Sequence, residues 1–397
     1  MARVVTGSRW AAIVGYSLVG AATQLVWLNF AGVTTVAAAH YGVSESAIGW
    51  LAQVFPLLYV VLAIPCGLIL DRWFRAGLLA GAVLTAVGAL VRLIGDDFGW
   101  LLAGQIVASV AQPLVLNAVT GITGRYLEED DRPTGIAVGT ASIFAGMVIA
   151  FSLDAIFTTG DSLGTMLAVT AIFCVAAAVV LIVALRNEGP HSVAAAAPSR
   201  DRSALKIAWG DPLIRRLCVL ALFPFGVFVA MTTFAQALLE PAGVSGGTAS
   251  TILLVTVVAG VLGSAIIPVV VVRRRAESAL LVLSLTVTSI ACVVLALAPG
   301  VLTGFVAIGL IGLLLLPALP IVLELVERRT GEAEGTAAGL IWMSGNLGGL
   351  LVATVVGLLV DYPTAAFLVM AVIPLIAVPG ARALRRPIDE LREQPQP

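Results

Sequence analysis

Residues 64–79 read IPCGLILDRWFRAGLL, and residues 266–281, half a chain length later, read IIPVVVVRRRAESALL. In both stretches a long apolar run gives way to a short cluster of basic residues, and a second apolar run follows at once. A tight basic turn of this kind is typical of a short loop between two membrane-spanning helices. Because the pattern occurs twice, it predicts a duplicated unit of several helices.

The composition extends this interpretation to the whole chain. Of its 397 residues, 60% are hydrophobic and only 11% are charged, whereas soluble domains carry about 25% charged residues. The charges gather between apolar runs of about 20 residues, the length that crosses ~30 Å of hydrocarbon. The net charge of −1 gives no reason to expect a nucleic-acid partner. We therefore predict an integral protein of a lipid bilayer.

The apolar runs divide into two sets of six, separated by the polar stretch 186–206. We expect an all-α membrane protein of twelve transmembrane helices in two six-helix bundles, residues 1–186 and 211–385, joined by a cytoplasmic linker, 187–210, and followed by a tail, 386–397. The expected spans are 10–38, 46–70, 76–94, 98–124, 134–158, 164–185, 211–239, 247–272, 277–298, 300–326, 335–359 and 363–383.

The basic residues also predict an orientation. If both termini are cytoplasmic, nearly every arginine of the short loops falls inside, as the positive-inside rule requires, and only Arg92 falls outside. The outer loops carry acids instead. We expect a multi-pass protein of the cell membrane, as in a bacterial inner membrane, that acts as a monomer. The inner arginines include Arg3, Arg9, Arg72, Arg75, Arg125, Arg132, Arg215, Arg216, Arg273, Arg274, Arg275, Arg328 and Arg329.

The first basic turn contains the pattern G-x-x-x-D-R-x-x-R, formed by Gly67, Asp71, Arg72 and Arg75. A glycine permits close helix approach, an aspartate can cap a helix or pair with a basic group, and arginines can tie one half to the other. The turn could also serve only to set topology. We interpret it as a gate, and parallel duplication of a six-helix unit around such loops is the architecture of the major facilitator superfamily.

A second pair of matched loops precedes the fifth and eleventh expected helices. Residues 124–139, GRYLEEDDRPTGIAVG, and residues 324–339, ELVERRTGEAEGTAAG, both place acids and arginines ahead of a glycine-spaced helix. Acids near a helix N-terminus favour its dipole. We expect gating and packing roles here. The gating candidates of these loops are Arg132, Glu324, Glu327 and Glu334.

Four stretches resemble a narrower group, the feline leukaemia virus subgroup C receptor-related transporters, or solute carrier family 49. They are WLNFAGVTTVAAAHYGVSESAIGWL at 27–51, VGALVRLIG at 87–95, GQIVASVAQPLVL at 104–116 and LELVERRTGEAEGTAAGLI at 323–341. In the second stretch Arg92 stands where the family has a lysine. The stretches lie in both halves and are specific as a set.

The resemblance implies transport of choline, ethanolamine or a related small organic solute, with vitamins and haem as other substrates proposed in the family. It marks Trp27 as the leading candidate for a ligand contact, and an indole face attracts a quaternary ammonium group by a cation–π interaction. Trp27 could instead pack between helices or lie in an interfacial aromatic belt.

At other positions the sequence departs from the family's site. The family's aromatic cage partner in helix 7 corresponds to Val229 and its glutamine in helix 5 to Phe144, so Phe228 or Phe144 would have to rebuild the cage. In helix 11 the family's asparagine and glutamine correspond to Trp342 and Asn346, both of which become candidate cavity residues.

The remaining site candidates are buried amides. Gln24 and Asn29 flank Trp27, Gln105 and Gln112 lie two turns apart in the fourth expected helix, and Gln236 lies in the seventh. Each could contact a solute, but hydrogen bonds between helices are an equal alternative. No acid falls clearly at the midplane, so the sequence gives no support to proton coupling.

These features favour a secondary or facilitative transporter of a small organic solute that works by alternating access. The alternative within transport is an efflux carrier for hydrophobic drugs or metabolites, suggested by the apolar Val229 and Phe144. We expect no catalytic residues, no metal and no cofactor, because the only histidines, His40 and His191, lie in or beside loops and no metal-spaced acid cluster occurs. A receptor without transport would usually add a soluble domain.

Overall fold

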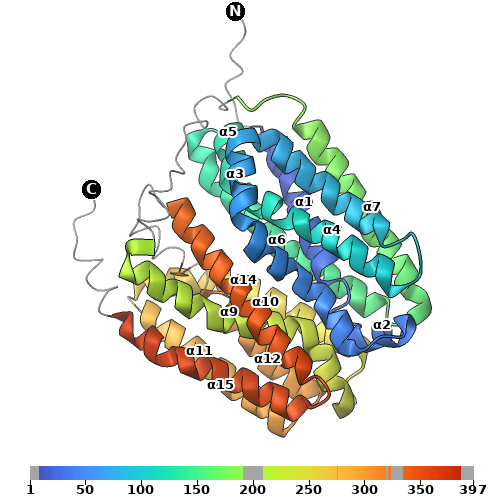
Figure 1. Cartoon of the computed structure of the whole chain (residues 1–397). Helices are drawn as coiled ribbons and strands as arrows, with labels where there is room; N and C mark the ends of the chain where they lie inside the picture. Colours follow the sequence, from blue (N-terminus) through green and yellow to red (C-terminus); the bar gives the residue numbers. More distant parts are fainter. Residues whose placement is uncertain (1–8, 191–208, 275, 319–320, 323–333, 386–397) are drawn as a thin grey trace, which may run out of the picture. The chain divides into compact units, whose positions relative to one another are not determined.

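The computed structural model describes residues 9–190, 209–274, 276–318, 321–322 and 334–385 (Figure 1). Within these ranges all regular elements are helices. The N-terminal part contains α1 (Trp10–Leu28), α2 (Thr34–Tyr41), α3 (Glu45–Val91), α4 (Phe98–Leu116), α5 (Val119–Tyr126), η1 (Glu129–Asp131), α6 (Arg132–Ile156) and α7 (Gly160–Ala184). The C-terminal part contains α9 (Pro212–Leu239), η3 (Glu240–Ala242), α10 (Gly246–Arg273), α11 (Glu277–Leu297), α12 (Val301–Leu315), α14 (Glu334–Leu358) and α15 (Pro363–Ala383).

The helices confirm the prediction of an all-α membrane protein. Among the described residues, 11 helical segments are long and apolar enough to cross a bilayer, two of them within α3. The shorter apolar helix α12 takes the place of the tenth expected span. Large apolar side chains cover outer faces of these helices, including Ile290, Leu368 and Val372, as expected where lipid rather than water is the surrounding solvent.

Two of the expected spans break into two helices, and the second and third expected spans meet at a kink. The expected span 10–38 breaks after Leu28. The expected span 98–124 breaks at Asn117, where the Asn117 side chain bonds to Tyr59 and to the carbonyl of Ala63. The second and third expected spans correspond to Glu45–Leu70 and Arg72–Val91, which meet within α3 at a kink at Trp73 (φ −134°, ψ 57°).

Two compact units make up the chain. Unit 1 contains residues 1–30, 36–44 and 57–198, and unit 2 contains residues 31–35, 45–56 and 199–397. Within unit 1, α1 packs against α4, α6 and α7. Within unit 2, α9 packs against α14, α10 against α12, and α11 against α15.

One glycine in each unit lets two backbones touch. A side chain at Gly146 of α6 would collide with the backbone of Ala21 in α1, and one at Gly348 of α14 would collide with the backbone of Leu222 in α9. Small residues are the usual means by which membrane helices approach closely, because lipid gives apolar side chains no hydrophobic drive to associate. The first and fifth spans of each half therefore meet in the same way, which supports the duplication.

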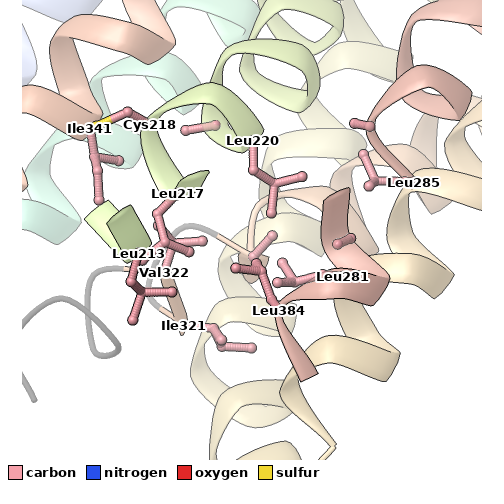
Figure 2. Close-up of a cluster of buried hydrophobic side chains, with 14 of the residues drawn as sticks. Leu213, Leu217, Cys218, Leu220, Leu281, Leu285, Ile321, Val322, Ile341 and Leu384 are labelled. Atoms are coloured by element: carbon pink, nitrogen blue, oxygen red, sulfur yellow. The ribbon is translucent and has the colours of Figure 1, made fainter. Parts of the chain in front are cut away.

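One end of unit 2 is a cluster of buried apolar side chains (Figure 2). The first turns of α9 supply Leu213, Leu217 and Leu220, and α11 supplies Leu281 and Leu285. Dispersion contacts in this cluster are individually weak and collectively large. The end of α9 where the chain enters the bundle is thus fixed by packing. Other members are Ile214, Cys218, Ala221, Val271, Leu280, Ala318, Ile321, Val322, Leu340, Ile341, Ala377, Val378, Ala381 and Leu384.

We predict that Gly146→Leu and Gly348→Leu each destabilise the protein by about 1–3 kcal/mol, the usual cost of overpacking. Each variant forces two helix backbones apart. Thermal unfolding of the detergent-purified protein, followed by size-exclusion chromatography, would measure the loss. Gly164→Leu is the matched control, because a side chain at Gly164 in α7 meets no atom within 4 Å. Equal melting temperatures for Gly146→Leu and Gly164→Leu would contradict the packing argument.

Candidate functional site

The candidate residues of unit 1 centre on α1. Trp27 is only 6% exposed, and Gln24 lies one turn before it and is buried. The Gln24 amide nitrogen donates a long hydrogen bond of 3.4 Å to the hydroxyl of Thr23. Its Oε1 atom is buried without a hydrogen-bond partner among the described residues. An unsatisfied buried acceptor is costly, so Gln24 has capacity left for a donor from a solute or from water.

The glutamines of α4 differ in their contacts. Gln105 donates to the backbone carbonyl of Val26 in α1 over 3.3 Å, one residue before Trp27. This bond is the interhelical role that the sequence left open as an alternative. Gln112, two turns further along α4, is also buried, and Phe144 of α6 is half-buried.

Asn29 closes the C-terminus of α1 and is engaged by a buried arginine. Its Oδ1 accepts a hydrogen bond of 2.9 Å from Nη2 of Arg92. The guanidinium group also lies 5.3 Å from the centre of the Phe30 ring. Arg92 is 2% exposed and interacts electrostatically with the buried Asp154 of α6. The one arginine that the sequence placed outside is therefore a buried group that fixes the end of α1.

Several donor atoms of this cluster have no acceptor in the described part of the chain. Nε and Nη1 of Arg92 and Nδ2 of Asn29 are buried without hydrogen-bond partners among the described residues. Asp154 lies inside the expected span 134–158, but the sequence alone does not pair it with Arg92. A buried arginine just beyond one span and a buried acid near the same end of another are the signal that could have suggested the pair.

In unit 2 the candidates form an aromatic corner between α9 and α14. The rings of Phe225 and Trp342 pack edge to face, with centroids 6.0 Å apart and planes at 83°. One turn after Trp342, the Asn346 amide nitrogen donates to the Trp342 carbonyl over 2.9 Å. Phe228 lies one turn after Phe225 and is buried. Phe225 was not among the residues singled out from the sequence.

Gln236, also predicted to line the cavity, has both ends of its amide occupied within unit 2. Its Oε1 accepts from the backbone N–H of Thr35 at 2.8 Å, and its Nε2 donates to the Thr35 hydroxyl at 2.8 Å. Both the oxygen and the nitrogen of this amide therefore already have a partner within the protein.

The arginines of the predicted gate act within unit 1. Arg75 donates to the carbonyl of Arg186 at 2.8 Å, and Arg9 donates to that of Glu188 at 3.1 Å. The hydroxyl of Tyr126 donates to the carbonyl between them, on Asn187, at 3.2 Å. Burial raises the pKa of Tyr126, which keeps this donor protonated. Three side chains from separate segments therefore hold the start of the linker.

Other gating candidates are placed in part. Gly67 is buried in α3, and Arg72 lies 4.6 Å from the ring centre of Trp73. Arg132 begins α6, and its Nε is buried without a hydrogen-bond partner among the described residues. The side chains of Asp71 and Glu334 fall outside the described part of the structure, as do Glu324 and Glu327 altogether.

Two helix bundles with polar and aromatic side chains on buried faces define a membrane transporter, and comparison with known proteins agrees. Residues 12–353 match the Major Facilitator Superfamily. The chain belongs to this superfamily of transporters and is not an enzyme.

Its relatives include members of solute carrier family 49 and the FLVCR transporters, which confirms the resemblance seen in the sequence. The chain is 26% identical to "Solute carrier family 49 member A3" of Danio rerio over 85% of its own length and 76% of that protein. It is 26% identical to "Choline/ethanolamine transporter FLVCR2" of Homo sapiens over 90% and 73% of the two chains.

Solved structures show the same fold. A bacterial homologue of the human lysosomal transporter Spinster, described as inward-facing and unoccupied, superposes with a TM-score of 0.74 at 14% identity and covers 98% of this chain and 99% of its own. A POT family transporter in complex with 5-aminolevulinic acid gives a TM-score of 0.75 at 12% identity, over 96% and 97% of the two chains. At this level of identity the likeness concerns the fold alone.

Arg92 and Asp154 should be energetically coupled. We predict that Arg92→Gln and Asp154→Asn each destabilise the protein, because each removes one of two buried groups of opposite charge that attract each other. The double variant should cost less than the sum of the two singles. Thermal unfolding of all four proteins measures the cycle. Strict additivity of the two single effects would show that the charges do not interact.

Proposed function

We propose that this chain carries a small organic cation or amine, such as choline or ethanolamine, by alternating access and facilitated diffusion. The observation that carries the proposal is the buried indole of Trp27, one turn after Gln24, whose Oε1 has no hydrogen-bond partner among the described residues. Unit 2 by itself presents an aromatic pair, Phe225 and Trp342. Indole and phenyl faces attract ammonium groups by cation–π interactions, which do not require a carboxylate partner. The human relative FLVCR2 and a zebrafish relative, which are choline/ethanolamine transporters, support the same class of solute.

The other candidate residues would then bind the polar groups of the solute. Oε1 of Gln24 lacks a hydrogen-bond partner among the described residues, so it suits the hydroxyl or amine hydrogen of choline or ethanolamine. The amide nitrogen of Asn346 donates to the backbone carbonyl of Trp342. Its amide oxygen would accept a hydrogen bond from the solute. Gln112 and Phe228 complete the set of proposed contacts. None of these groups is charged, in keeping with a carrier that is not driven by protons.

The second candidate, an efflux carrier for hydrophobic compounds, has less support. It rested on apolar residues in place of the family's glutamine and aromatic cage partner. Val229 is fully buried, and it lies within van der Waals reach of a side chain built at Gly349 of α14. It therefore serves the packing of α9 on α14. Phe144 remains as the one half-buried apolar side chain that favours this alternative.

We further propose that the basic loops face the cytoplasm, as in a bacterial inner membrane. The arginines of the inner loops support this orientation. Reporter fusions at Arg75 and Arg274 should give cytoplasmic signals, and fusions at Asp96 and Asp361 should give signals from the opposite side. A reversed pattern would overturn the orientation without affecting the fold.

Trp27 provides the test of the substrate. We predict that Trp27→Ala weakens choline binding by about 2–30-fold, the loss expected for a cation–π contact of about 0.5–2 kcal/mol. Ligand-induced thermal shifts over choline, ethanolamine, vitamins and hydrophobic drugs would measure it on the purified protein. Trp27→Phe should keep part of the affinity because it retains an aromatic face.

Trp100→Ala is the matched control, since this indole is 41% exposed in α4. If choline stabilises the wild type, Trp100→Ala and Trp27→Ala equally, Trp27 is not a ligand contact. If only hydrophobic drugs stabilise the protein, the efflux alternative replaces the proposal.

A further inference from the structure

Arg92 is a buried cation without a close counter-ion. Only 2% of this residue is exposed, although it directly follows α3, at the start of the turn that leads to α4. In the described part of the chain, no carboxylate oxygen lies within 4.0 Å of its guanidinium nitrogens, and Asp154 attracts it over a longer distance. A buried charge is costly unless it is paired and hydrogen-bonded. The guanidinium group therefore gains from a further partner of negative charge.

Three donor atoms at this place have no hydrogen-bond partner among the described residues. They are Nε and Nη1 of Arg92 and Nδ2 of Asn29, and all three are buried. The two side chains are already joined, because Nη2 of Arg92 donates to Oδ1 of Asn29 at 2.9 Å. A positive charge combined with several free N–H donors is the chemistry that recognises an anion.

Packing from several elements of unit 1 holds Arg92 in place. Its stem passes α4 at Gly104, where a side chain would collide with Cγ of Arg92. Its guanidinium carbon lies 5.3 Å from the centre of the Phe30 ring, and that ring in turn meets Tyr41 of α2 edge to face, with centroids 6.4 Å apart. Donors that are held by packing lose little conformational freedom when a ligand binds.

These donors are separate from the proposed contact with the ammonium group. Asn29 follows Trp27 by two residues and still has helical dihedral angles (φ −59°, ψ −10°), and residues two apart do not share a face of a helix. The two residues after Arg92, Leu93 and Ile94, are 40% and 60% exposed. The buried guanidinium group therefore lies close to the surface, within reach of an ion from solution.

We propose that Arg92 and Asn29 bind a small monovalent anion, either chloride or the carboxylate of a small organic acid. Both ligands are acceptors only, so they can receive hydrogen bonds from the three unpartnered donors. One negative charge matches the single positive charge of Arg92, whereas a doubly charged anion would add repulsion from Asp154. The bound anion completes the hydrogen bonding of Arg92 and so stabilises the end of α1. This site is additional to the proposed function and does not rest on it.

Thermal unfolding of the whole detergent-purified protein, measured without choline, tests the site. Sodium chloride or sodium acetate replaces sodium isethionate, the salt of a bulkier anion, at constant sodium concentration. We expect chloride, acetate or both to raise the melting temperature by about 2–5 °C, because a ligand stabilises the folded state that binds it, and the rise should level off at high concentration. A response to chloride alone identifies a halide ion as the ligand, and a response to acetate alone identifies the carboxylate of an organic acid.

Two substitutions alter the site in different ways. Asn29→Asp keeps the oxygen that accepts from Arg92 and puts a carboxylate oxygen in place of the unpartnered amide nitrogen, so the protein supplies its own anion. Arg92→Lys keeps the charge but replaces the fork of N–H donors by a compact ammonium group. We expect Asn29→Asp to abolish the anion-dependent rise and Arg92→Lys to increase the half-saturating anion concentration about tenfold.

Exposed residues of the same types provide the matched controls. Asn187 and Arg216 are both exposed, so Asn187→Asp and Arg216→Lys should keep the full rise in melting temperature. The proposal is overturned if neither anion gives the wild type a saturable rise, or if site variants and controls respond alike, as a general salt effect would produce. If Asn29→Asp does not fold, the comparison of Arg92→Lys with Arg216→Lys decides by the same criterion.

Discussion

The structure depends on one constraint: hydrocarbon offers no hydrogen-bond partners, so each backbone group inside the bilayer must be satisfied by the protein itself. Helices meet this demand, and hydroxyl side chains within them return their hydrogens to carbonyls one turn back, as Thr85, Ser109 and Thr170 do. Wherever a helix stops inside the apolar region, a polar side chain must take over. Arg92 engages Asn29 at the end of α1, and Asn117 bonds to α3 where α4 ends. The breaks and the buried polar residues are therefore two aspects of one requirement.

The same solvent determines how the helices associate. Because lipid does not drive apolar faces together, close approach has to come from shape, and Gly146 and Gly348 provide it at matched places in the two units. Once α1 lies on α6 and α9 lies on α14, Trp27 and the pair Phe225 and Trp342 occupy the first and fifth helices of their units. Duplication thus gives both units the same packing of a first on a fifth span, with different side chains on each.

Length, hydropathy and the two basic turns were sufficient to predict the class of fold, since each span is specified locally by its own apolar run. The breaks within the first and fourth spans were missed, because Asn29 and Asn117 stop a helix only through partners that lie far away in sequence. The roles of the site residues were hard to predict for the same reason, because they depend on partners that lie far away in sequence. Composition identifies Gln105 and Gln236 as buried amides, but only the fold shows that the first bonds to Val26 and the second to Thr35. Phe225 carried no local signal at all.

A buried amide in a membrane protein can hold helices together or bind a solute, and the pairing of its hydrogen-bonding atoms helps to distinguish the two roles. An amide that holds helices together is most stable with a partner at each end, because an orphan group in hydrocarbon costs free energy. Gln236 meets this condition at both of its ends. An amide that binds a solute must have a polar atom without a protein partner, and this atom costs free energy when no solute is bound. Gln24 does so, with Oε1 buried and unpartnered among the described residues one turn from Trp27. Solute binding can pair this oxygen and remove its free-energy cost. This favours Gln24 over Gln236 as the polar contact near the Trp27 indole.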